Sequence, residues 1–200
     1  MAYGFEARSL RRDELAAAIE ALLFASDSPL TVDRMREILN EVMGAQNGSA
    51  VSDEDVVAAL DLLRRRHEES VSGIDLQEVA GGYQLTTKPR YAAYVGRLFK
   101  TKTPGLSQAA LETLAIVAYR QPITRAEIDM LRGVNSERAV ATLIERDLIR
   151  EVGRKQVAGR PILYGTTREF LRYFGLKDIN DLPPLPEDTP SELGFGATRE

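Results

Sequence analysis

The chain carries the same local pattern twice, with the second copy 93 positions after the first. In each copy an apolar run (21–25 and 114–118) is followed by a proline, an apolar residue and a threonine (29–31 and 122–124). Proline disfavours helix in the residue before it, and threonine is a good N-cap for the next helix. Two helices joined by so short a corner form a helix-turn-helix. The sequence therefore predicts two helix-turn-helix units in tandem.

Length and composition are compatible with this arrangement. A chain of 200 residues is long enough for two compact domains, and its 44% hydrophobic and 28% charged content is ordinary for a soluble protein. No apolar run reaches the roughly 20 residues that span a bilayer, and residues 1–12 lack the apolar segment of a secretion signal. The absence of cysteine excludes disulfides and thiolate metal sites. These features predict a cytoplasmic protein.

The first half predicts three helices followed by a β-hairpin. Apolar residues recur at helical spacing over 13–26 and 31–43, and the acidic start and basic end of 52–66 suit a third helix. The period then changes to two over 74–86, around a pair of glycines. Residues 13–100 thus predict a winged helix-turn-helix domain whose wing is the hairpin. Its closing helix is expected to direct four residues inward: Tyr91, Val95, Leu98 and Phe99.

The second half repeats this order. Helices are expected over 107–120, from the capping box at 124–127 and after 135–136, and a second wing is expected over 149–167. A capping box formed by Thr166 and Glu169 is expected to open the closing helix. That helix carries three aromatic residues: Phe170, Tyr173 and Phe174.

The predicted fold class is mainly α-helical with small β-hairpins, built as two tandem winged helix-turn-helix domains. The segments are an N-terminal extension (1–12), a first domain (13–100), a linker (101–106), a second domain (107–176) and a tail (177–200). The tail combines Leu-Pro-Pro-Leu-Pro with acidic residues, so we expect it to be extended or disordered.

The sequence offers little for catalysis. His67 is the only histidine, and its charged neighbours predict a solvated position at the end of a helix. A catalytic triad or a two-histidine metal site cannot be built from one such residue, and there is no glycine-rich nucleotide fingerprint. We expect no enzyme activity, no cofactor and no metal.

Charge is unevenly distributed over this chain of net charge −4. Residues 88–102 and 148–168 each contain five basic residues, and Glu151 is the only acidic residue among them. The helices that would enter a DNA groove present carboxylates or mixed charges, not the residues that read base edges. The basic wings fit either an acidic protein partner or DNA phosphates. Ordinary solvated faces are an equal alternative.

Several stretches of the chain resemble the bacterial segregation and condensation protein B family. They are residues 111–128, 132–136, 150–155, 159–167 and 170–175, and more loosely 20–26 and 28–31. The resemblance implies a non-enzymatic subunit of the bacterial condensin-like complex, which acts in chromosome condensation and segregation. It implies a homodimer that binds a kleisin, which bridges the heads of a structural-maintenance-of-chromosomes ATPase.

The same resemblance implies a cytoplasmic protein that reaches the nucleoid through this complex and contacts DNA indirectly or weakly. The alternative is a DNA-binding transcriptional regulator with tandem winged helices, which would protect a defined operator.

The resemblance places the self-contact of the dimer in the first domain. Candidate contact residues lie off the buried stripes of their helices: Phe24, Val57 and Leu62. Membership of the domain's own core is an equal alternative for each of them.

The second domain is expected to bind the kleisin through its wing and its closing helix. The apolar candidates, whose alternative is the domain core, are Ile149, Val157, Leu163, Tyr164 and Tyr173. The basic candidates on the wing are Arg150, Arg154, Lys155 and Arg160. They are too concentrated to be neutralised by Glu151 alone, and they are expected to meet an acidic stretch of the kleisin, or DNA phosphates weakly.

Overall fold

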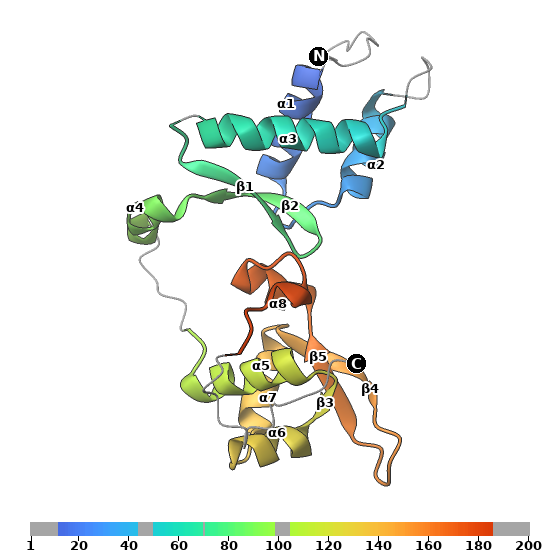
Figure 1. The fold of residues 1–200 in the computed structure, drawn as a ribbon, viewed down its shortest axis with the longest axis vertical. Helices are drawn as coiled ribbons and strands as arrows, with labels where there is room; N and C mark the ends of the chain where they lie inside the picture. The colour runs from blue at the N-terminus through green and yellow to red at the C-terminus, as the bar shows by residue number, and fades with distance from the viewer. Residues whose placement is uncertain (1–11, 44–49, 70, 99–104, 186–200) are drawn as a thin grey trace. The chain divides into compact units, whose positions relative to one another are not determined.

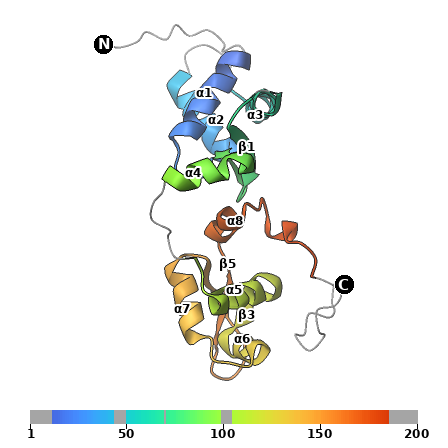
Figure 2. The same cartoon turned by 90° about the vertical axis from the view of Figure 1, so that its left-hand side faces the viewer.

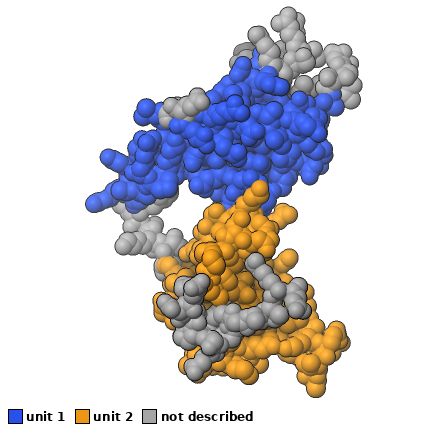
Figure 3. Space-filling model, viewed as in Figure 1, with its two compact units in different colours: residues 1–101 blue, residues 102–200 orange. Residues whose placement is uncertain are grey.

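The computed structural model describes residues 12–43, 50–69, 71–98 and 105–185. The chain divides into two compact units, residues 1–101 and 102–200, which are coloured separately in Figure 3. Both are helical with a small antiparallel sheet, as predicted (Figure 1). None of the helices in the described part of the chain is long and apolar enough to cross a membrane.

Three helices form the body of the first unit: α1 (Arg12–Ala25), α2 (Val32–Met43) and α3 (Asp53–Glu69). Helix α3 crosses α1 in Figure 1, and the two helices pack closely. Their apolar stripes meet because side chains three or four positions apart share one face of a helix. The buried residues of this core are Leu15, Ala16, Ile19, Leu23, Met35, Leu39, Val51, Val56, Ala59, Leu60, Leu63 and Leu76.

Local hydrogen bonds fix the starts of two of these helices. Thr31 caps α2, because its Oγ1 accepts a hydrogen bond from the backbone N of Arg34 at 3.2 Å. Ser52 and Asp55 form a reciprocal pair at the start of α3: the backbone N of Asp55 donates to Ser52 Oγ at 3.2 Å, and that of Ser52 donates to Asp55 Oδ2 at 3.0 Å. The threonine predicted from the repeat therefore does cap its helix.

The first wing is the hairpin of β1 (Ile74–Val79) and β2 (Gly82–Thr87). Its turn has φ of 52° at Ala80 and 72° at Gly81, the pair of positive angles that suits the twist of a two-residue hairpin loop. The hairpin also pairs with the helix-turn-helix corner. Leu30 and Tyr83 exchange two backbone hydrogen bonds, of 2.9 and 2.8 Å.

The closing segment of the first unit differs from the prediction. It consists of η1 (Pro89–Tyr91) and α4 (Ala92–Leu98), and neither contains a buried residue. Leu98 is 77% exposed rather than directed inward, while Tyr91 and Val95 are only partly buried. Phe99 lies outside the described residues.

The second unit repeats the plan with α5 (Gln108–Arg120), α6 (Arg125–Arg132) and α7 (Glu137–Glu145), followed by a wing of β4 (Ile149–Arg154) and β5 (Ile162–Thr166). Figure 2 shows α5, α6 and α7 gathered around the short strand β3 (Ile123–Thr124). This strand was not predicted. It adds to β5 and completes a three-stranded sheet of order β3-β5-β4.

Of the two capping boxes predicted in the second unit, the first is confirmed and the second is wrong. Ser107 accepts a hydrogen bond from the backbone N of Ala110 at the start of α5, and Thr124 and Glu127 form a full capping box on α6. The closing helix α8 (Arg168–Phe174) is capped by Thr167 and not by Thr166. Thr166 belongs to β5, where it pairs with Ile149.

The segment after α8 also departs from the prediction. It forms the short helix η2 (Ile179–Asp181), and Leu176, Ile179 and Leu182 pack against the core of the second unit. The Tyr119 hydroxyl donates a hydrogen bond of 2.7 Å to the Pro183 carbonyl. The part of the expected extended or disordered tail that the structure describes, up to residue 185, is therefore attached to the domain.

Candidate partner-binding surface on the second wing

The sheet of the second unit separates the candidate residues into an inner and an outer face. Ile149 is 1% exposed and Tyr164 is 8% exposed, and both belong to the core of the unit. Tyr164 pairs with Ile123 of β3, which is equally buried. For these two candidates the core alternative holds, so their side chains are not available to a partner.

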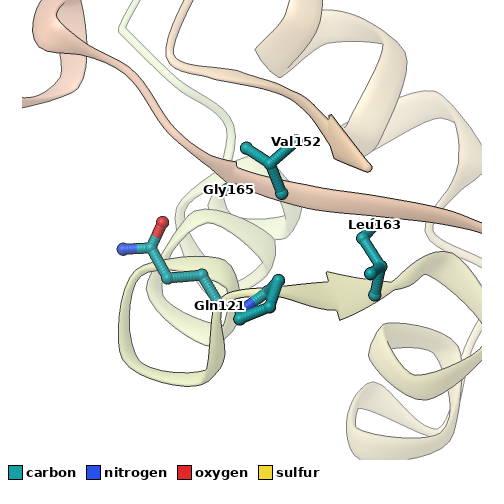
Figure 4. A pocket seen from close by; sticks show the side chains of 5 residues that line it. Gln121, Val152, Leu163 and Gly165 are labelled. Carbon is teal, nitrogen blue, oxygen red and sulfur yellow. The ribbon is translucent and has the colours of Figure 1, made fainter. Parts of the chain in front are cut away.

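The outer face carries an open pocket of about 370 Å³ at the junction of β3, β4 and β5. Its lining is Gln121, Pro122, Val152, Leu163 and Gly165, and Figure 4 shows the side chains around Gly165. A side chain at the floor of the pocket would require Val152 or Gln121 to shift, because a Cβ on Gly165 would lie 2.9 Å from Val152 Cγ1 and 3.0 Å from Gln121 Oε1. Of the predicted residues, only Leu163 lines this pocket.

The helix-turn-helix corner builds one wall of the pocket. Gln121 Oε1 accepts hydrogen bonds from the backbone N of Thr166 at 2.7 Å and from its Oγ1 at 3.0 Å. Gln121 Nε2 donates to the Ala118 carbonyl at 3.3 Å, and the Gln121–Pro122 peptide bond is cis. These contacts hold Pro122 beside β5.

A β-bulge in strand β4 shapes the opposite wall. The register shifts between Glu151 and Gly153, so Val152 has no partner of its own on β5. A bulge twists the strand and redirects a side chain. Here it places Val152 over Gly165, with 46% of the valine exposed.

Basic residues at the wing tip are partly committed to contacts within the domain. Lys155 Nζ donates to Glu127 Oε1 at 2.5 Å, so an acidic residue from α6 neutralises it. This corrects the expectation that only Glu151 balances the wing. Arg154 donates to the Arg160 carbonyl at 3.3 Å, while its side chain and that of Arg160 remain exposed.

The contact with Lys155 also perturbs Glu127. The hydrogen bond from Lys155, followed by those from Thr124, lowers the pKa of Glu127 to about 2. Glu127 therefore stays charged and ties the start of α6 to the wing.

The other two partner candidates of this unit lie away from the pocket lining. Val157 is 50% exposed at the wing tip, and Tyr173 is 52% exposed on α8. The Tyr173 ring stacks edge-on against Phe174, with centroids 5.1 Å apart. The structure therefore does not gather all the candidates into one site.

The dimer candidates in the first unit differ in accessibility. Phe24 is 79% exposed and Val57 is 41% exposed, whereas Leu62 is partly buried and packs against the core. Sequence reasoning missed Tyr94, which is exposed on α4 along with Leu98. Leu98 belongs to the apolar stripe that was predicted to face inward, whereas Tyr94 lies outside that stripe.

His67 is not the solvated residue that was predicted. It is buried at the end of α3, with Nε2 3.1 Å from Glu20 Oε1 and Nδ1 3.3 Å from Ser72 Oγ, and its carbonyl accepts from Lys88 Nζ at 2.5 Å. These contacts join α1, α3 and the closing segment, which is a structural role. Among the residues that the structure describes, no group of three His, Cys, Asp or Glu side chains is placed to hold a metal ion.

Comparison with known proteins gives consistent matches. The family model of the segregation and condensation complex subunit ScpB matches residues 17–185. A segregation and condensation protein B from Symbiobacterium thermophilum is 51% identical over 177 residues, covering 88% of this chain and 76% of that protein. Another from Desulforamulus reducens is 45% identical over 181 residues, covering 89% and 93%.

Solved structures related in sequence carry the same family name. ScpB from Mycobacterium tuberculosis is 38% identical, with a TM-score of 0.40 and coverage of 84% of this chain and 99% of that one. A dimer of the ScpB N-terminal domain complexed with a ScpA peptide is 29% identical, with a TM-score of 0.35 and coverage of 42% and 93%. The family follows from the sequence matches, which span both winged units: the chain belongs to the ScpB family of segregation and condensation complex subunits.

Proposed function

We propose that this chain is a homodimeric, non-enzymatic subunit of the bacterial condensin-like complex, and that it binds the kleisin that bridges the heads of the structural-maintenance-of-chromosomes ATPase. The observation that carries the proposal is the family match over residues 17–185, which includes both wings and both helix-turn-helix corners. The protein would act in the cytoplasm and reach the nucleoid through this complex.

The proposed self-contact lies in residues 13–100. Phe24 and Val57 leave large apolar surface exposed on α1 and α3, and apolar surface of this kind is stabilised when a second subunit covers it. Light scattering on the full chain should give the mass of a dimer, and Phe24→Glu should shift the mass toward the monomer. A strict monomer at tens of micromolar for the unmodified chain would contradict the proposed dimer.

The proposed kleisin surface lies on the wing of the second unit. Exposed arginines and exposed apolar residues occur there together: Arg150, Arg154, Arg160, Val152 and Val157. An amphipathic partner segment with acidic residues would complement both kinds of side chain.

Calorimetry with the kleisin from the same genome tests this assignment. Because one solved ScpB structure is an N-terminal domain dimer complexed with a ScpA peptide, kleisin binding should be measured for the full chain and for a chain that ends at residue 101. We expect the truncated chain to lose most of the affinity. Equal affinities would contradict a role for the second unit, and tight sequence-specific DNA binding by the full chain would support a transcriptional regulator instead.

A further inference from the structure

The pocket on the second wing lies beside an arginine that has no side-chain partner among the described residues. Arg150 pairs directly with Gly165 in the β4–β5 ladder. Residues opposite each other in an antiparallel ladder share a face of the sheet, and so do residues two apart along a strand. Arg150, Gly165 and Leu163 therefore lie on the same face, and the exposed guanidinium leaves the sheet on the side of the pocket.

The pocket itself is accessible and mostly apolar. Val152 and Pro122 are exposed and Leu163 is partly buried, and Figure 4 shows Val152 and Leu163 beside Gly165. Its volume of about 370 Å³ falls at the lower end of the range of about 300–1,000 Å³ typical of small-ligand sites. One large apolar side chain is a suitable occupant.

The first wing provides an internal comparison. In both wings a glutamate of the first strand pairs with a tyrosine of the second. At the position before this pair, the first wing has Gln77 opposite Gln84, whereas the second wing has Arg150 opposite Gly165. At this ladder position the second wing thus has an arginine opposite a glycine, whereas the first wing has neither a charged residue nor a glycine.

We propose that this face binds a short acidic segment of the kleisin, which inserts one apolar side chain into the pocket and places a neighbouring carboxylate on Arg150. The inference rests on the proposed function and specifies the face and the chemistry of the contact. Arginine suits the contact with the carboxylate, because its planar guanidinium pairs bidentately with a carboxylate.

The geometry favours side-chain docking by a protein over two other modes of binding. Strand β4 is at the edge of the sheet, but its bulge at Val152 and its exposed charges oppose the addition of another strand. A nucleic acid backbone would need several cations on this face, whereas Arg154 lies on the opposite face and Lys155 is already paired with Glu127.

The test uses the full chain and the kleisin from the same genome, with affinities measured by calorimetry. Arg150→Glu and Val152→Asp should each weaken binding about tenfold or more. Arg138→Glu is the matched control: it makes the same charge change at an exposed position of the same unit, on helix α7 and outside the proposed partner surface. This control should stay within about twofold of the unmodified chain.

The outcomes separate this inference from the proposed function. If the unmodified chain binds the kleisin and neither Arg150→Glu nor Val152→Asp weakens binding more than Arg138→Glu, the pocket inference is wrong and the proposed function stands. If the unmodified chain does not bind, both fail. Thermal melting shows whether each variant is folded. If a variant is not folded, Arg150→Gln is measured in its place, because glutamine is the residue that the first wing has at the equivalent position. Loss of DNA binding with unchanged kleisin binding in Arg150→Glu would assign this face to nucleic acid and overturn the inference.

Discussion

Replacing Glu127 by glutamine removes one charge from the contact between α6 and the second wing. Glu127 Oε2 accepts hydrogen bonds from the backbone N of Thr124 at 2.9 Å and from its Oγ1 at 2.7 Å, while Oε1 accepts from Lys155 Nζ at 2.5 Å. Glutamine has nearly the same shape and keeps one acceptor oxygen for Thr124. Glu127→Gln therefore isolates the charge from the rest of the capping box.

The expected loss of stability follows from the pKa of Glu127, which falls from 4.5 to about 2. A shift of this size would correspond to about 3 kcal/mol for a buried group, but the Glu127 side chain is 39% exposed and solvent screens the pair. We therefore expect a loss of about 1 kcal/mol near pH 7. In a unit of this size, that lowers the melting temperature by about 4–8 °C.

The pH dependence has a definite sign. Because the folded-state pKa of Glu127 is lowered, its stabilisation is fully present above pH 4.5 and is lost as the pH falls through about 2. The difference between the original chain and Glu127→Gln should therefore shrink by more than half between pH 7 and pH 3.

Hydrogen exchange localises the effect to α6 and β5, so the unfolding of the first unit does not interfere. Glu145→Gln is the control, because Glu145 is exposed on α7 and has no ion-pair partner among the described residues. An equal loss of protection in both variants at pH 7, or a Glu127→Gln effect that is unchanged at pH 3, would refute the reasoning.

Three further substitutions, and a fourth that serves as a control for one of them, test the packing of the two units by thermal denaturation. Leu143→Ala should cost about 2–5 kcal/mol, because Leu143 is fully buried in the second core; a loss below 1 kcal/mol would contradict this. Gly82→Ala should cost about 1–3 kcal/mol, because the new Cβ would lie 2.9 Å from the Leu30 carbonyl oxygen, whereas Gly96→Ala, in an open position within a helix, should be neutral or stabilising. His67→Ala should destabilise the first unit by about 1–3 kcal/mol, because it removes a buried side chain that contacts Glu20 and Ser72; an unchanged melting temperature would restore the prediction of a solvated histidine.

Features that depend on nearby residues were predictable from the sequence. Thr124 and Glu127 form the predicted capping box, and the hairpin over 74–86 closes at its glycine turn. The exception among the caps is instructive. Thr166 and Thr167 are adjacent, and only the pairing of Thr166 with Ile149 in the ladder leaves Thr167 to cap α8.

Features that depend on distant parts of the chain were not predictable in the same way. An apolar stripe at helical spacing gives the face of a helix but not the existence of a neighbour to cover it, which is why Leu98 is exposed. Similarly, Lys155 finds its partner Glu127 at a distance of 28 residues along the chain, and the pocket forms because Gln121 reaches Thr166. The alternation of side chains along a strand could have shown that Ile149 and Arg150 lie on opposite faces. It could not have shown which residues lie beside Arg150.

The duplicated corner shows how one scaffold supports two different surfaces. In both units the apolar residue of the corner pairs with a tyrosine of the wing, Leu30 with Tyr83 and Ile123 with Tyr164. In the first unit the glycine before this tyrosine packs against the corner backbone and leaves no room for a side chain. In the second unit the glycine follows the tyrosine, lies opposite Arg150 and lines the pocket. Residues one before and one after the tyrosine lie on the same face of the strand, so this face packs against the corner in the first wing and carries the pocket in the second. This difference is why we propose the partner contact for the second unit.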